Sequence, residues 1–167
     1  MKQPEFLSPG DLVAIVAPAR WVNKRDMKYA KQLLLQWSFK VIFGQSVGAR
    51  HHQFAGHDEL RAQDLQWALD HPDIKAIWCA RGGYGTIRIL DQISFEGFLK
   101  HPKWILGYSD ITALHAELHK LGWASIHAQM PLAIEEKTLK TKQSIRKALT
   151  GEPYEIIWET SNSFLEI

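Results

Sequence analysis

The stretch that decides the fold is Trp104-Ile105-Leu106-Gly107-Tyr108-Ser109-Asp110-Ile111-Thr112, where an apolar run stops and a helical segment begins at once. A serine on such a strand-to-helix turn has an exposed hydroxyl, and the first amides of the helix face the same space. This arrangement suits acyl transfer through an oxyanion.

A simpler role for the same residues is structural. Ile111 stands where the Gly-x-Ser-x-Gly turn of α/β-hydrolases has its second glycine, so the match to that motif is incomplete. Gly107 could merely turn the chain, and Ser109 or Asp110 could merely cap the helix.

The alternation of strand and helix extends outward from this turn. Apolar runs predict strands at residues 12–17, 40–43, 75–80, 103–106 and 123–127. Helical spacing predicts helices at residues 24–38, 57–70, 86–92 and 110–122, and residues 46–56 form a polar loop. Strands that alternate with helices form right-handed crossovers. We therefore expect an α/β fold with an open parallel sheet and helices on both faces, a flavodoxin-like three-layer sandwich.

The alternation fades after Pro131. We expect a helix at residues 138–150, ended by Gly151, and an edge strand at residues 154–158. This divides the chain into a nucleophile-bearing α/β domain, residues 1–135, and a C-terminal helix and strand, residues 136–167, that lead to a missing second domain. We also expect an exposed apolar patch, covered by self-association, around Ile156, Trp158 and Phe164.

Composition limits the class of protein. The chain has 167 residues, 46% of them hydrophobic and 23% charged, with a formal net charge of +2. These values fit one globular domain with a substantial core and no preference for nucleic acid or an anionic membrane. The single cysteine, Cys79, excludes an intramolecular disulfide, and no run is long enough to span a membrane. We therefore expect a cytoplasmic protein.

Three loops are expected to meet beyond the carboxyl ends of the strands, where open parallel sheets bind ligands. They are residues 17–20, residues 81–85 and the serine turn, and His127 ends the fifth strand on the same rim. Gly82 and Gly83 would let backbone amides approach a ligand closely. Gly-Gly-x-Gly matches neither a Walker A loop nor Gly-x-Gly-x-x-Gly, so the glycines favour a second oxyanion donor or a tight connection over a nucleotide site.

A serine nucleophile needs a base. Among the eight histidines, His115 and His119 lie along the helix after the serine and are expected to point away from the rim. The pair His51-His52 lacks acidic or cysteine partners at ligand spacing, so we expect no metal and no cofactor. Only His127 is placed to approach Ser109. The sequence thus predicts a well-placed serine without a convincing base.

Taken together, these segments resemble the LD-carboxypeptidase family, serine peptidases that include muramoyltetrapeptide carboxypeptidases and microcin-immunity peptidases. The matching segments are Pro9-Gly10-Asp11 with Val16-Ala17-Pro18-Ala19, Ala80-Arg81-Gly82-Gly83-Tyr84-Gly85, and Gly107-Tyr108-Ser109-Asp110-Ile111-Thr112. His127-Ala128-Gln129-Met130-Pro131 is similar to a divergent form of the family's His-Gly-Pro segment. The resemblance covers about residues 6 to 131, and the combination is far more specific than its parts.

The resemblance implies a cytoplasmic hydrolase that removes the terminal D-alanine of a murein tetrapeptide across an L-to-D peptide bond, with a Ser-Glu-His triad and no metal. Ser109 matches the nucleophile. The amides of Asp110 and of the Gly82-Gly83 turn, with Gly83 preferred, match the oxyanion hole. Arg81 is expected to bind the substrate carboxylate, with Tyr84 and His127 as further substrate contacts. Family members commonly form dimers.

One departure from the family is large. Its glutamate and histidine come from a second, C-terminal domain, and this sequence has no segment that matches it. The chain therefore resembles the nucleophile domain alone and is expected to be nearly inert by itself. Two alternatives stay open: a non-catalytic flavodoxin-like module that binds a small peptide or nucleotide, and catalysis within the chain by Ser109 and His127.

Overall fold

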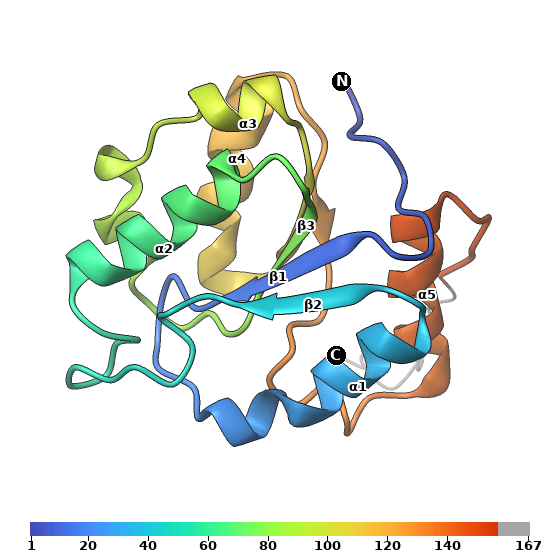
Figure 1. The fold of residues 1–167 in the computed structure, drawn as a ribbon, viewed down its shortest axis with the longest axis horizontal. Coiled ribbons are helices and arrows are strands. Elements are labelled where there is room, and N and C mark those ends of the chain that lie inside the picture. Colours follow the sequence, from blue (N-terminus) through green and yellow to red (C-terminus); the bar gives the residue numbers. More distant parts are fainter. Residues whose placement is uncertain (157–167) are drawn as a thin grey trace, which may run out of the picture.

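A five-stranded parallel sheet organises the computed structural model, which describes residues 1–156 (Figure 1). The strand order is β2-β1-β3-β4-β5, and every neighbouring pair is parallel. The strands are β1 (Leu12–Val16), β2 (Lys40–Phe43), β3 (Ile74–Cys79), β4 (Trp104–Gly107) and β5 (Ile126–His127). The order reverses between β1 and β3, which is the flavodoxin-like arrangement. The predicted open parallel sheet is confirmed.

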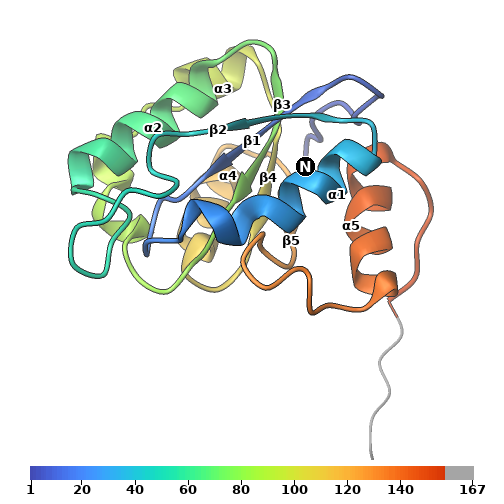
Figure 2. The same cartoon turned by 60° about the horizontal axis from the view of Figure 1, so that its bottom comes forward.

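Helices cover both faces of this sheet, which completes the predicted three layers (Figure 2). Helices α1 (Lys28–Gln36) and α5 (Leu139–Thr150) pack on one face. Helices α2 (Asp58–Asp70), α3 (Glu96–Lys100) and α4 (Thr112–Lys120) pack on the other. Along β1, Val13 and Ile15 enter the first core while Ala14 and Val16 enter the second. Because side chains alternate along a strand, burial on both faces produces the continuous apolar run of the sequence.

Several polar residues form hydrogen bonds with the backbone at the ends of helices. The Thr138 hydroxyl accepts from the Thr141 N–H (3.2 Å) at the start of α5, and Gly151 ends the helix with φ +75°. Lys103, which we assigned to a strand, lies buried just before β4 instead. Its ammonium donates to the carbonyls of Ala68 (3.0 Å) and His71 (2.6 Å), at the C-terminus of α2. Burial lowers the pKa of Lys103 to about 8.

Two element predictions were wrong in part, and one short helix was not predicted. Residues 86–92 form two short 3₁₀ turns, η2 (Thr86–Arg88) and η3 (Leu90–Gln92), and the short helix α3 was not expected. Gly85 (φ +146°) leads into these turns, and the segment is too short and irregular to complete an α-helix. The fifth strand contains only Ile126–His127, because Trp123 instead bridges to Lys2.

Of the two elements predicted near the C-terminus, the helix is present, and the described part of the edge strand is not a strand. Residues 138–150 form α5 nearly as expected, and its Ile145 and Leu149 enter the α1-side core. Residues 154–156 are not a strand, and the remainder of the predicted edge strand, with Trp158 and Phe164, lies outside the described residues. Ile156 is exposed. The division of the chain at residue 135 stays a prediction.

Candidate active site

Ser109 occupies a strained position at the end of β4. The strand ends at Gly107, the 3₁₀ turn η4 (Ser109–Ile111) follows, and α4 begins at Thr112. Ser109 has φ +61°, a left-handed conformation that costs a non-glycine residue about 1 kcal/mol or more, and it is exposed. A Cβ on Gly107 would lie 2.8 Å from Ile111, so glycine is required there. The serine is therefore held outward, as the strand-to-helix pattern predicted.

The glycine turn after β3 packs directly against the serine turn. A Cβ added to Gly82 would lie 3.4 Å from the Asp110 nitrogen and 3.3 Å from the Tyr108 carbonyl oxygen. The Asp110 N–H is at the start of a helical turn, where amides have no intrahelical acceptor. Gly83 has φ +111°, and its N–H donates no hydrogen bond within residues 1–156. Two unused amides thus occur on adjoining turns beside an exposed hydroxyl.

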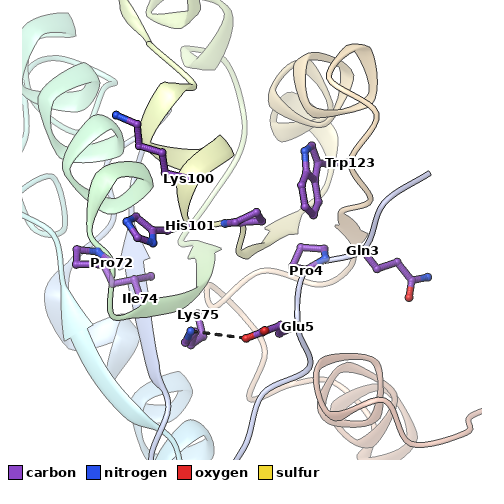
Figure 3. A pocket seen from close by; sticks show the side chains of 10 residues that line it. Gln3, Pro4, Glu5, Pro72, Ile74, Lys75, Lys100, His101 and Trp123 are labelled. Atoms are coloured by element: carbon purple, nitrogen blue, oxygen red, sulfur yellow. Dashed lines mark ion pairs between the residues drawn. The ribbon is translucent and has the colours of Figure 1, made fainter.

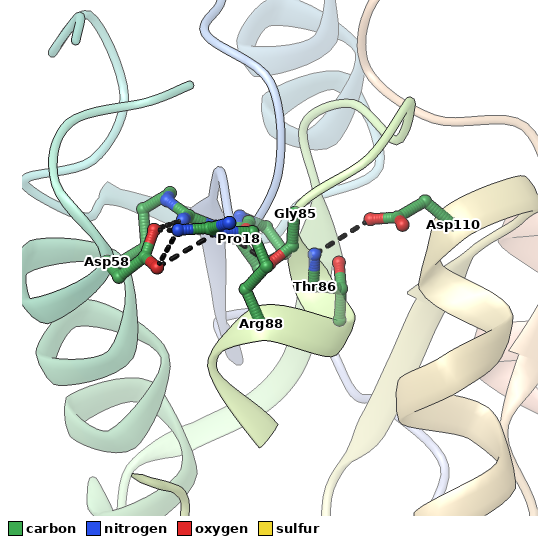
Figure 4. A network of polar contacts seen from close by, with 7 residues as sticks. Pro18, Asp58, Gly85, Thr86, Arg88 and Asp110 are labelled. Carbon is green, nitrogen blue, oxygen red and sulfur yellow. Dashed lines mark hydrogen bonds and ion pairs between the residues drawn. The ribbon is translucent and has the colours of Figure 1, made fainter. Parts of the chain in front are cut away.

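Two side chains that our sequence analysis did not single out for these roles tie the rim loops together (Figure 4). The Asp110 carboxylate accepts from the Thr86 N–H (2.9 Å), which joins η4 to the segment after the glycine turn. Arg61, on α2 and fully buried, donates to the carbonyls of Pro18 (2.6 Å) and Gly85 (2.9 Å). It therefore links the loops after β1 and β3. An arginine at a helical position looks like a surface residue in sequence, so no signal pointed to Arg61.

Asp58 balances the charge of this network. It pairs with Arg61 and with Arg88 (2.7 Å). The hydrogen bond from Arg88 lowers the pKa of Asp58, with smaller contributions from Arg61. Burial lowers the pKa of Arg61, although Asp58 opposes that shift. The buried cation is thus compensated by a carboxylate, and Arg88 adds a second, exposed partner.

The prediction for His115 was wrong. Its Nε2 lies 3.0 Å from the Gly107 carbonyl oxygen, directly behind the serine turn, and the side chain is buried. His115 lies four residues after Ile111, so both project from one face of the helix toward Gly107. That spacing was available in the sequence. Burial lowers the pKa of His115, and its Nδ1 has no hydrogen-bond partner within the described residues. His119 is exposed, as expected.

The exposed His127 lies near the site without completing it. Its ring centroid is 6.1 Å from that of Tyr108 and 6.2 Å from that of His115. Within residues 1–156, no hydrogen bond joins the Ser109 hydroxyl to His127 or to another base. The structure therefore places an exposed serine hydroxyl near unpartnered amides, and no base is among the contacts of that serine within residues 1–156.

The remaining candidates lie on the neighbouring loop surface. Arg81 is half-buried, and its guanidinium donates to the Trp21 carbonyl (3.2 Å). Tyr84 is exposed, with its ring centroid 6.1 Å from that of Phe54. Both roles in substrate binding stay predictions.

A cavity of about 350 Å³ lies at the other end of the sheet, where β3 begins (Figure 3). Lys75, Lys100 and His101 line it, and Lys75 is 3.9 Å from Glu5. Helices α2 and α3 both end near this cavity, and helix C-termini favour cations. The positive charge here therefore lies near two helix C-termini and one carboxylate, Glu5.

The described residues contain no group of three or more His, Cys, Asp or Glu side chains that could hold a metal ion. His51 and His57 stack at 3.8 Å between ring centroids, and His52 contacts His51 edge-on. None of the helices in residues 1–156 has the length and apolar character needed to cross a membrane.

Comparison with known proteins gives consistent matches. The family described as LD-carboxypeptidase N-terminal domain matches residues 13–128. A putative carboxypeptidase of Synechocystis sp. is 34% identical over 152 residues, which are 90% of this chain and 50% of that protein. A probable murein peptide carboxypeptidase of Bacillus subtilis is 36% identical over 129 residues, which are 77% of this chain and 40% of that protein.

Solved structures agree with these sequence matches. The crystal structure of a muramoyltetrapeptide carboxypeptidase from Oxalobacter formigenes superposes with a TM-score of 0.75 at 29% identity, covering 83% of this chain and 48% of that one. The chain thus spans about half the length, or less, of the curated relatives it matches.

Proposed function

The chain belongs to the LD-carboxypeptidase family, and from that membership we propose that it carries the nucleophile and oxyanion hole of a serine carboxypeptidase. The substrate is a murein tetrapeptide, and the bond cleaved is the L-to-D peptide bond that holds its terminal D-alanine. The reaction takes place in the cytoplasm. The observation that carries the proposal is the exposed Ser109 at φ +61°, on a turn whose Asp110 amide lies against Gly82.

In this reaction the Ser109 oxygen attacks the scissile carbonyl carbon while a base takes the hydroxyl proton. The N–H groups of Asp110 and Gly83 stabilise the oxyanion of the tetrahedral intermediate. The C–N bond then breaks, and the departing D-alanine amine takes the proton from the protonated base. Water, deprotonated by the same base, hydrolyses the acyl-enzyme and restores Ser109.

We assign the base to a histidine, oriented by a glutamate, in the second, C-terminal domain that the family resemblance implies. This assignment rests on the family resemblance and on the contacts of Ser109, since no histidine in the described part hydrogen-bonds to it. Arg81, Tyr84 and His127 contact the substrate around the nucleophile. Without its base the serine retains only oxyanion and binding effects, so the chain alone reacts slowly.

The test combines a covalent probe with ligand titration. A fluorophosphonate should modify Ser109 slowly, detected by intact mass and peptide mapping, and Ser109→Ala should abolish the modification. His127→Ala should leave labelling unchanged. Abolished labelling in His127→Ala would instead establish catalysis within the chain.

Calorimetric titration separates the catalytic proposal from a binding module. Murein tetrapeptide should bind the wild type, and ATP and FMN should not. Tight binding of ATP or FMN without peptide binding would refute the peptidase proposal and favour a non-catalytic module.

We further propose that the protein self-associates, as a homodimer, through the surface around the exposed Ile156. Light scattering should give twice the monomer mass of 19.1 kDa. A monodisperse monomer would contradict this part of the proposal.

A further inference from the structure

Six of the seven arginines fall into two groups by their partners, and Arg25, in the 3₁₀ turn at Lys24–Met27, belongs to neither although it also has no ion pair within residues 1–156. Arg61 and Arg88 pair with Asp58, and Arg146 pairs with Glu152 at 2.7 Å. Arg20, Arg50 and Arg81, here called the rim arginines, form no ion pair within residues 1–156. All three belong to loops at the carboxyl ends of the strands.

Trp21 brings the rim arginines together. The Arg81 guanidinium donates to the Trp21 carbonyl (3.2 Å), and the Arg50 guanidinium lies 4.3 Å from the centroid of the Trp21 ring. Arg20 precedes Trp21, and its Nη2 donates to the Gln53 Oε1 atom (3.0 Å). The Nε of Arg20 is buried and has no hydrogen-bond partner among the described residues. The three cations thus come from the loops after β1, β2 and β3.

A cavity of about 460 Å³ is lined by Trp21, Lys24 and Arg50 among others, whereas Arg20 and Arg81 adjoin it through Trp21 and are not lining residues. Lys24 adds a fourth positive charge and has no ion pair within residues 1–156. Asp26, in the same 3₁₀ turn as Lys24, pairs with none of these cations in the described structure. Gathered like charges repel, and an anionic ligand would relieve that repulsion.

The cluster adjoins the nucleophile through the glycine turn. Arg81 is followed by Gly82, whose Cβ position is 3.4 Å from the Asp110 nitrogen. A Cβ on Gly83 would lie 2.5 Å from the Arg20 side chain. The Gly82 position therefore lies against the Asp110 amide, and the Gly83 position lies against the Arg20 side chain.

We propose that the rim arginines and Lys24 form a subsite for the carboxylates of an acidic peptide, seated beside Ser109. This inference rests on the proposed function, because a murein tetrapeptide carries free carboxylates away from the scissile bond. Arginine binds carboxylates through paired N–H groups, and the cavity has the size of a side-chain or short-peptide site. Arg81 then acts within a cluster rather than as a single carboxylate contact.

Calorimetry with murein tetrapeptide and its fully amidated analogue tests the subsite. The acid should bind wild type about tenfold tighter than the amide, and the gap should shrink with rising salt. Arg50→Gln, Arg81→Gln and Lys24→Gln should each remove most of that gap. Arg146→Gln, which removes an arginine from a paired surface site, should preserve it. Arg50 and Lys24 are exposed, so their variants are expected to fold.

The other outcomes distinguish failure of this inference from failure of the proposed function. Equal binding of acid and amide to wild type overturns the subsite and leaves the peptidase proposal standing. An acid preference that survives Arg50→Gln and Arg81→Gln also overturns it, because the selectivity then comes from elsewhere. If neither peptide binds, citrate is titrated. Citrate binding that the arginine variants abolish supports an anion site while refuting the peptide substrate, and no citrate binding overturns both.

Discussion

The two ends of the sheet carry similar charges in opposite situations. At the end where the strands begin, Lys103 donates to two carbonyls at the terminus of α2. Lys75, at the same end, lies near Glu5 (Figure 3). At the end where the strands finish, Arg20, Arg50 and Arg81 gather without a carboxylate in the described residues. Lys103 and Lys75 at the first end have carbonyl or carboxylate partners, whereas the rim arginines at the second end, unlike Arg61 and Arg88 there, have no ion-pair partner within residues 1–156.

Strained serines, unlike the unpaired arginines, occur at both ends of the sheet. Ser109, at the carboxyl end, has φ +61° and stands exposed beside two unused amides. Ser38, in the turn before β2, has a similar φ of +67° but precedes a strand at the opposite end. A left-handed serine alone therefore does not define a site. The difference lies in what surrounds it, namely the glycine turn and the helix start.

The largest expected effect concerns Arg61, the buried cation at the carboxyl end of the strands. Arg61→Met should destabilise the protein by about 3–5 kcal/mol, because two buried carbonyls lose their donor and the paired charge is broken. Arg88→Met, which removes the exposed partner of the same Asp58, should destabilise the protein far less, because solvent screens an exposed ion pair. Urea unfolding monitored by tryptophan fluorescence measures both. Equal losses would mean that Arg61 does not hold the rim loops together.

Lys103 provides the matching experiment at the other end. Its pKa is lowered from 10.5 to about 8 in the folded protein, so the unfolded chain binds more protons between these values. Stability should therefore rise as pH increases through that window, by about 1–3 kcal/mol. Urea midpoints at several pH values should show the rise in wild type and in Lys100→Met, an exposed lysine of the same surface. Lys103→Met should lack it, and an unchanged profile would contradict the assignment.

Sequence periodicity predicted the sheet and the position of the serine, because both depend on local pattern. The continuous burial of β1, β3 and β4 and the glycine at residue 107 are visible in the residues themselves. The contacts that join the loops were not predictable, because Arg61 comes from α2 and reaches carbonyls far away along the chain. The same holds for the rim arginines, whose common neighbour Trp21 is apparent only once three loops fold together. Local pattern locates the serine turn, and tertiary contacts determine its surroundings.

Removing the backbone strain at Ser109 should stabilise the protein. This effect is smaller than the loss expected for Arg61→Met and opposite to it in sign. Ser109→Gly should stabilise the protein by about 1 kcal/mol, because glycine adopts φ +61° without the Cβ clash. Ser38→Gly should stabilise by a similar amount for the same reason. Only Ser109→Gly should abolish fluorophosphonate labelling. If Ser109→Gly were destabilising while Ser38→Gly were not, the serine would be contributing contacts that offset its strain.

The smallest expected effect comes from His115, behind the serine turn. Burial lowers its pKa below 6.5, opposed by its bond to the Gly107 carbonyl and assisted by the nearby His127 and His119. The unfolded chain therefore takes up a proton first as pH falls, so stability should decline below about pH 6.5. His115→Gln keeps an N–H donor for the Gly107 carbonyl and should reduce that decline, whereas His119→Gln, on an exposed position of the same helix, should not. Urea midpoints at about pH 7.5 and 5.5 measure the difference. An identical decline in both variants would show that protonation elsewhere weakens the fold and that the serine turn is insensitive to the imidazole behind it.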